Sequence, residues 1–179
     1  MYNKMNSIMQ KNEEKILREL FNKPSYKFHI RELARITKLN PNTIINIAKK
    51  LEKQRLVKNE PKKHLTEISL NFENKETTWK KRVFNLSQIY SSGVIEFLVK
   101  KYSPVSISLI GSYSRGEDIE KSDIDIVLIT GKKEIADLSE FDKILGKRIH
   151  LLTAKTSDIS DEFFNNLING IVLYGAVKR

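Results

Sequence analysis

Two aspartates separated by one residue are the groups in this sequence best suited to do chemistry. Asp123 and Asp125 open an apolar run, 126–129, that is typical of a strand inside a sheet. Because side chains alternate along a strand, the two carboxylates project to the same face. Proteins commonly hold Mg²⁺ with one or two carboxylates and the phosphates of a substrate. The pattern therefore predicts a magnesium–triphosphate site at the start of this strand, with Asp123 and Asp125 as the metal ligands.

The segment before the aspartates carries groups suited to phosphate. A β-branched run, 105–110, predicts a strand that leads directly into a Gly-Ser turn. Gly111 lets the backbone approach a phosphate because it has no Cβ. Ser112 can donate its hydroxyl and its amide, and Arg115 can add a forked, charge-assisted contact. These three residues form the predicted nucleotide-binding set.

In order and spacing, these motifs resemble the DNA polymerase β-like nucleotidyltransferase superfamily, and more closely its minimal nucleotidyltransferase branch. The resemblance spans about residues 93–175, including a last segment, 170–175, that is similar to the closing strand of that branch. It implies an α+β fold with a small mixed sheet. It also implies transfer of a nucleoside monophosphate from a nucleoside triphosphate, with ATP expected, to a hydroxyl. Two Mg²⁺ ions would be carried by the aspartates.

One position departs from the family pattern. Members usually add a third carboxylate on a later strand, and the matching strand here, 147–152, places His150 there. Imidazole is a poorer Mg²⁺ ligand than carboxylate, but it can act as a general base. His150 is therefore either a catalytic base or the mark of a degenerate site that binds nucleotide, or nothing, without turnover. The loop acids Glu117, Asp118 and Glu120 are weaker substitutes, because a loop position does not fix them beside the metals.

The first part of the chain resembles a different kind of domain. Apolar spacing predicts helices at 13–21, 31–37 and 41–54, the last beginning after the N-cap Asn40. A short strand at 28–30 and alternation over 65–70 add a hairpin whose break is predicted at 59–63. This order resembles the winged helix-turn-helix of archaeal and bacterial transcription regulators over about residues 10–72. In that fold the second helix of the turn lies in the major groove and the wing contacts the backbone.

Charge supports a polyanion partner for this first part. Residues 1–80 hold 18 Lys and Arg against 9 Asp and Glu, whereas residues 81–179 hold 14 against 13. A solvated surface on a protein-interaction or dimerisation module is the alternative. The predicted contacts to double-stranded DNA are amide, hydroxyl and ammonium groups that reach bases or phosphates: Asn42, Thr43, Asn46, Lys49 and Lys50 on the helix, and Lys62 and Lys63 on the wing.

Composition narrows the remaining possibilities. The chain has no cysteine, which excludes a disulfide framework and a Cys-based zinc site. We find no apolar run long enough for a membrane span and no signal-peptide pattern, so we expect no membrane partner and a cytoplasmic location. The predicted domains are a winged helix-turn-helix at 1–72, a connector at 73–87 and a nucleotidyltransferase-like domain at 88–179.

The predicted function is that of a Mg²⁺-dependent nucleotidyltransferase acting on a protein or nucleic-acid hydroxyl and tethered to DNA by the winged helix. A first alternative is a DNA-binding regulator whose degenerate transferase domain senses nucleotide or mediates assembly. A second alternative follows from the resemblance, because minimal nucleotidyltransferases often pair with a small helical toxin as antitoxin-like partners. A homodimer is the default expectation, since winged helices often bind DNA as dimers.

Overall fold

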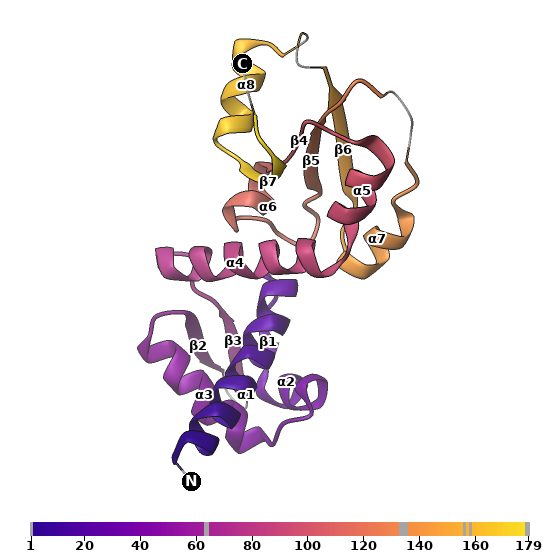
Figure 1. Cartoon of the computed structure of the whole chain (residues 1–179). Helices are drawn as coiled ribbons and strands as arrows, with labels where there is room; N and C mark the ends of the chain where they lie inside the picture. The colour runs from indigo at the N-terminus through magenta and orange to yellow at the C-terminus, as the bar shows by residue number, and fades with distance from the viewer. Residues whose placement is uncertain (1, 63–64, 133–135, 156, 158, 178–179) are drawn as a thin grey trace. The chain divides into compact units, whose positions relative to one another are not determined.

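The computed structural model describes residues 2–62, 65–132, 136–155, 157 and 159–177. The chain divides into two compact units, Met1–Thr78 and Trp79–Arg179. Each unit has its own sheet and its own covering helices, as the ribbon in Figure 1 shows. Among the described residues, no helix has both the length and the apolar character needed to cross a membrane.

The first unit combines three helices with a small antiparallel sheet. The helices are α1 (Tyr2–Asn22), α2 (Ile30–Thr37) and α3 (Pro41–Lys53). The strands β1 (Phe28–His29), β2 (Val57–Lys62) and β3 (Leu65–Leu70) form a sheet in the order β1-β3-β2. Fully buried apolar side chains from both layers form the core of this unit, including Ile16, Leu20, Phe28, Leu33, Ile44, Leu51 and Ile68.

The start of α3 follows the sequence prediction. The Asn40 side chain accepts a hydrogen bond of 2.8 Å from the backbone N–H of Asn42, and Pro41 occupies the first helical position. Before it, Lys38 adopts a left-handed conformation (φ 57°) that ends α2 and makes the predicted turn. The predicted N-cap and turn are therefore confirmed.

The hairpin differs from the prediction. The predicted break at 59–63 is wrong, because β2 stays paired with β3 through Asn59 and up to the pair Lys62–Leu65. Pro61 lacks an N–H donor and suggested an interruption, but β2 lies at the edge of the sheet, where a proline is tolerated. Residues 63–64, between β2 and β3 in the sequence, lie outside the described residues.

One helix covers the predicted connector. Helix α4 (Lys75–Ser91) begins in the first unit and continues into the second, where α5 (Val94–Tyr102) follows after Gly93. Gly93 has φ 79°, a left-handed conformation that ends one helix direction and starts the next. Residues 73–87 are thus mostly helical, and several of them are buried in the second unit.

The second unit is built on a mixed four-stranded sheet in the order β6-β5-β4-β7. The strands are β4 (Ser106–Ile110), β5 (Ile124–Ile129), β6 (Ile149–Ala154) and β7 (Ile171–Gly175). Strand β4 runs antiparallel to β5 and β7, and β5 runs parallel to β6. The shorter helices are α6 (Gly111–Arg115), α7 (Ser139–Leu145) and α8 (Asp161–Ile168). This mixed α+β architecture fits the predicted nucleotidyltransferase fold.

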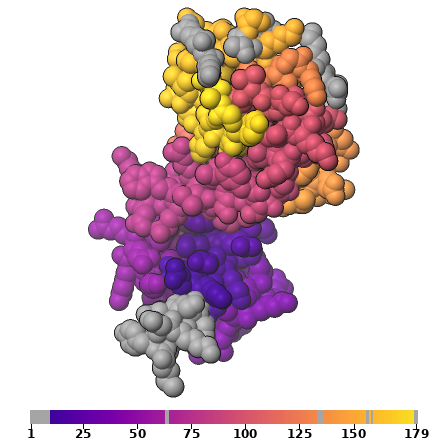
Figure 2. Space-filling model, in the orientation of Figure 1, coloured from indigo at the N-terminus to yellow at the C-terminus, as the bar shows by residue number. Residues whose placement is uncertain are grey.

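The two faces of β5 belong to different apolar clusters. Ile124, Ile126 and Leu128 pack with residues of α5, whereas Val127 and Ile129 pack with Leu167 of α8. Because side chains alternate along the strand, Asp125 lies on the α8 side of the sheet. Figure 2 shows the yellow C-terminal segments on the surface of the second unit.

Candidate active site

The carboxylate of Asp125 lies between two other predicted site residues. Asp125 pairs in register with Ile110 of β4 and with His150 of β6. Its Oδ1 lies 3.1 Å from His150 Nδ1, and its Oδ2 lies 2.5 Å from where a Cβ on Gly111 would be. Asp125 is 33% exposed and His150 is 55% exposed, so the group is open to solvent. The structure therefore brings together the Asp125 carboxylate, the His150 imidazole and the backbone of Gly111, which carries no side chain.

Two features of the structure favour glycine at position 111. Gly111 has φ 73°, which favours glycine, and any side chain there would collide with the Asp125 carboxylate. The chain passes at this point straight from β4 into the short helix α6, so the predicted Gly-Ser turn is the first part of a helix. Ser112 and Arg115 both lie on α6, and Arg115 Nε donates to Glu117 Oε2 at 2.7 Å.

Asp123 lies just before β5 and is exposed. A tight turn precedes it, in which the Ser122 N–H donates to the Ile119 carbonyl at 3.0 Å and the Ile119 N–H donates to Ser122 Oγ at 3.0 Å. Within the described part of the chain, no group of three or more His, Cys, Asp or Glu side chains is arranged to hold a metal ion. Two carboxylates can still hold Mg²⁺ when phosphate oxygens complete the coordination.

Comparison with known proteins identifies the second unit. Residues 91–172 match the model of a family described as "Nucleotidyltransferase domain". Over 68 residues the chain is 40% identical to the "putative protein adenylyltransferase" of Methanocaldococcus jannaschii, covering 34% of this chain and 68% of that protein. The chain belongs to the nucleotidyltransferase domain family. No solved structure matches it.

The match confirms the prediction of a nucleotidyltransferase, and it covers every residue predicted for catalysis and nucleotide binding. Within this nucleotidyltransferase domain, His150 of β6 lies beside Asp125 of β5, and its catalytic role stays a prediction. The individual roles of Gly111, Ser112, Arg115 and the two aspartates stay predictions. The first unit lies outside the matched segment.

Sequence reasoning missed a buried ionic cluster in the nucleotidyltransferase domain. Asp118, treated above as an unfixed loop residue, is 1% exposed and pairs with Lys81 of α4, which is 0% exposed. Asn85, one helical turn after Lys81, donates to Asp118 Oδ1 at 2.7 Å and to the Tyr113 carbonyl at 2.9 Å. Lys147 Nζ lies 3.4 Å from Asp118 Oδ2. The four-residue spacing places Lys81 and Asn85 on one helix face, but nothing in the sequence marks that face as buried.

Burial dominates the electrostatics of this cluster. It lowers the pKa of Lys81, and the hydrogen bond and charge of Asp118 oppose that effect. Burial also raises the pKa of Tyr113, with a further contribution from the negative charge of Asp118. A carboxylate and a lysine removed from water in this way depend on each other for their charged forms.

The predicted DNA contacts lie on the surface of the first unit, with two qualifications. Asn42, Asn46 and Lys49 are exposed on α3, and Thr43 is half-buried. The remaining contacts differ in their surroundings: Lys50 Nζ donates to Glu13 Oε2 of α1 at 2.5 Å, Lys62 lies 3.1 Å from Glu67, and Lys63 lies outside the described residues.

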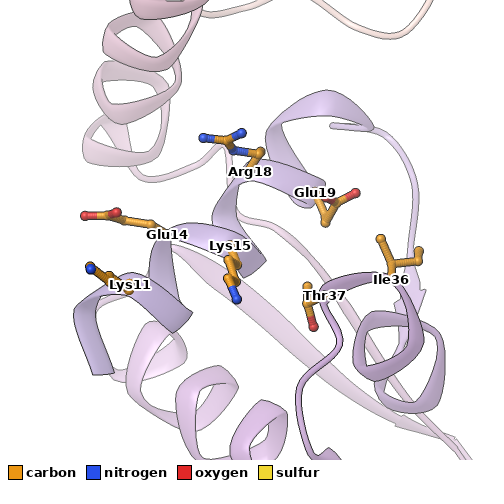
Figure 3. Close-up of a pocket in the computed structure, with 7 residues that line it drawn as sticks. All are labelled: Lys11, Glu14, Lys15, Arg18, Glu19, Ile36 and Thr37. Atoms are coloured by element: carbon orange, nitrogen blue, oxygen red, sulfur yellow. The ribbon is translucent and has the colours of Figure 1, made fainter. Parts of the chain in front are cut away.

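Besides a cavity of about 400 Å³ that Lys49 of α3 helps to line, two further cavities are of interest. Figure 3 shows a pocket of about 430 Å³ in the first unit, where charged side chains of α1 of both signs, including Arg18 and Glu19, face Ile36 and Thr37 of α2. It contains none of the predicted site residues. A second cavity, of about 400 Å³, lies in the nucleotidyltransferase domain and is lined by His150, Arg148 and Asp142, among others. It provides space beside the candidate active site.

Proposed function

We propose that the nucleotidyltransferase domain transfers AMP from ATP to a hydroxyl of a protein. The observation that carries this proposal is the Asp125 carboxylate held between Gly111 and His150. The name of the Methanocaldococcus jannaschii relative, a protein adenylyltransferase, supports the choice of nucleotide and acceptor. Gly111, Ser112 and Arg115 bind the triphosphate in this proposal, because all three follow β4 directly at the site.

The residues present fit Mg²⁺. Asp123 and Asp125 offer accessible carboxylate oxygens, and the absence of a Cβ at Gly111 leaves Asp125 Oδ2 unobstructed. These two aspartates would hold the metal. When bound, Mg²⁺ would neutralise the charge of the triphosphate and stabilise the attacking and leaving oxygens.

His150 is the general base in this proposal. Its Nδ1 is engaged by Asp125 Oδ1, which leaves Nε2 for the acceptor. The acceptor hydroxyl oxygen forms a bond to the α-phosphorus, the bond between that phosphorus and the bridging oxygen of pyrophosphate breaks, and the hydroxyl proton passes to Nε2. Asp125 thereby orients the imidazole, in addition to its role as a metal ligand.

We also propose that the first unit is a winged helix that recruits the enzyme to double-stranded DNA. The element order from α1 to β3 supports this proposal, as do the exposed amide and ammonium groups on α3 and the excess of Lys and Arg in residues 1–80. In that arrangement α3 enters the major groove and the β2–β3 hairpin contacts phosphates.

Transfer of labelled AMP from ATP to protein tests the enzymatic proposal. The variants Asp123→Asn and Asp125→Asn should each reduce transfer by more than about 100-fold, since even outer-shell partners of metal ligands contribute 10- to 100-fold. Glu140→Gln, at an exposed acid of α7, is the matched control. Variants that transfer AMP as fast as the parent would show that the aspartates are not the metal site.

A second candidate function is nucleotide sensing without turnover. It is favoured by an imidazole in place of the usual third carboxylate. The variant His150→Asp distinguishes the two functions over about pH 5.5 to 8.5, the range around the titration of a typical imidazole. If His150 is the base, the parent rate rises with pH and the variant is slower. If the site is a sensor, the parent is inactive and the variant binds Mg²⁺ more tightly and gains transfer.

A further inference from the structure

The buried carboxylate of Asp118 links, by ion pairs and hydrogen bonds, the segments that carry the candidate catalytic groups. Asp118 accepts from Lys81 and Asn85 of α4, which lie one turn apart on the same helix face. On its other side it faces Lys147, which lies two residues before β6 and three before His150. The three charged members are almost completely buried, with side-chain exposures of 0%, 1% and 9% for Lys81, Asp118 and Lys147.

The same cluster continues by hydrogen bonds toward the site. Asn85 holds the carbonyl of Tyr113, the residue after Ser112 in α6. Lys147 Nζ donates to the carbonyl of Ile119, the first residue of the turn that ends at Ser122. Asp123 follows that turn directly. The cluster thus connects the nucleotide-binding helix, the approach to the first aspartate and the entrance of the strand that carries His150.

Buried polar networks of this kind fix geometry. In a low-dielectric interior each member is costly to leave without its partners, so a network of paired buried charges favours one arrangement strongly. An ordinary surface loop between Gly116 and Asp123 would not need an aspartate paired with a fully buried lysine. Lys81, Asn85 and Lys147 contact Asp118 and backbone carbonyls, and none of the four is among the predicted site residues.

We propose that Asp118 is a positioning residue for nucleotidyl transfer, setting the placement of Asp123 and His150 around Asp125 through Lys81, Asn85 and Lys147. This inference rests on the proposed function for the identity of the reaction. Outer-shell partners of this type affect metal affinity or activity by about 10- to 100-fold. The expected effect of disrupting the cluster is therefore a loss of that size in AMP transfer.

The test separates positioning from simple stability with two variants of the full chain. Lys81→Met/Asp118→Asn removes both members of the most deeply buried pair together, so neither is left as a charge without its partner, and Lys147 keeps its bond to the Ile119 carbonyl. Lys147→Met leaves the Lys81–Asp118 pair intact and removes the contacts of Lys147 with Asp118 Oδ2 and with the Ile119 carbonyl. Lys121→Met, an exposed lysine of the same loop, is the control. Each variant is measured by thermal melting, by AMP transfer, and by ¹⁵N NMR of His150, which reports whether Nδ1 keeps its hydrogen bond to Asp125.

Positioning predicts that at least one of the two cluster variants melts close to the parent, transfers AMP about 10- to 100-fold more slowly and shows altered His150 nitrogen signals. Cluster variants that fold, transfer at the parental rate and leave those signals unchanged would overturn the inference. If the double variant does not fold, Lys147→Met decides by the same criteria. A parent that transfers nothing would contradict the proposed function instead, and the His150 signals would then decide the positioning inference alone.

Discussion

The two units use charge in opposite ways. The first unit has ion pairs in water: Lys27–Glu60 and Lys58–Glu73, each 2.7 Å long, join side chains that are between 41% and 80% exposed. In two further pairs of this unit the lysine is exposed and the glutamate, Glu13 or Glu67, is 17% or 16% exposed. The second unit buries Lys81 and Asp118 almost completely, with Lys147 beside them. Yet the second unit has nearly balanced charges in its sequence, whereas the first has most of the positive excess.

The difference shows that net charge indicates a binding partner only where the charged groups are exposed. Exposed pairs are screened by solvent and salt and contribute little, so their lysines can turn to another anion at small cost. A buried pair allows no such exchange, because either partner alone would be a charge without solvation. The excess positive charge of the first unit therefore suits a polyanion partner. The second unit has a balanced charge, but its buried ionic network favours a fixed geometry.

Replacing one lysine in each unit should give the largest difference in the free energy of unfolding. Lys81→Ala leaves the buried Asp118 with Asn85 and Lys147 as its partners and should lower the free energy of unfolding by about 3 kcal/mol, the lower end expected for breaking a buried pair. Lys27→Ala should leave it almost unchanged, because both partners are solvated. Urea denaturation followed by circular dichroism measures both. Equal losses would remove the distinction drawn between the two units.

Two glycines sharpen the comparison within the second unit. Gly111 and Gly146 have similar left-handed conformations, with φ 73° and 66°, so alanine at either should cost about 1–2 kcal/mol of stability. Only at Gly111 would the new Cβ meet Asp125 Oδ2, at 2.5 Å, whereas nothing lies within 4 Å at Gly146. Calorimetry with Mg²⁺ and ATP should show weaker binding for Gly111→Ala alone. Equal binding by both variants would place the nucleotide elsewhere.

Features that depend on local sequence could be predicted, and features that depend on contacts between distant residues could not. Strands β4 and β5 could be predicted, because alternation and β-branched runs determine strand faces locally. The position of His150 is inferred from the family resemblance, since alternation along one strand does not show which strand lies beside it. The cluster around Asp118 could not be predicted, since its partner Lys81 is 37 residues away and a lysine in a polar segment suggests a solvated face. The break predicted at 59–63 is wrong for a related reason: only the sheet order shows that Pro61 lies in an edge strand, where a proline is tolerated.

Lysines of the first unit should affect DNA binding uniformly across sequences. In the full chain, Lys49→Ala plus Lys62→Ala should weaken binding to duplex DNA and flatten the salt dependence by up to about 2 units, one for each lost phosphate contact. Lys100→Ala plus Lys155→Ala, at exposed positions of the second unit, should change neither. Fluorescence anisotropy with labelled DNA over a range of salt measures the slopes. A loss of binding in the second pair alone would move the DNA surface to the nucleotidyltransferase domain.

The smallest expected effect concerns pH and the exposed pair of the first unit. The hydrogen bond from Lys27, followed by its charge, lowers the pKa of Glu60, so this stabilisation is present above the unfolded-state pKa and is lost as pH falls through the folded-state value. Glu60→Gln should therefore melt slightly below the parent at neutral pH and equally at low pH. Salt at about 1 M, where the Debye length is near 3 Å, should remove the difference. The destabilisation caused by Lys81→Ala should persist in the same salt, because its partner is shielded from ions. Melting curves of both variants with and without salt test this contrast, and a salt-sensitive Lys81→Ala would mean that the buried pair is accessible to solvent.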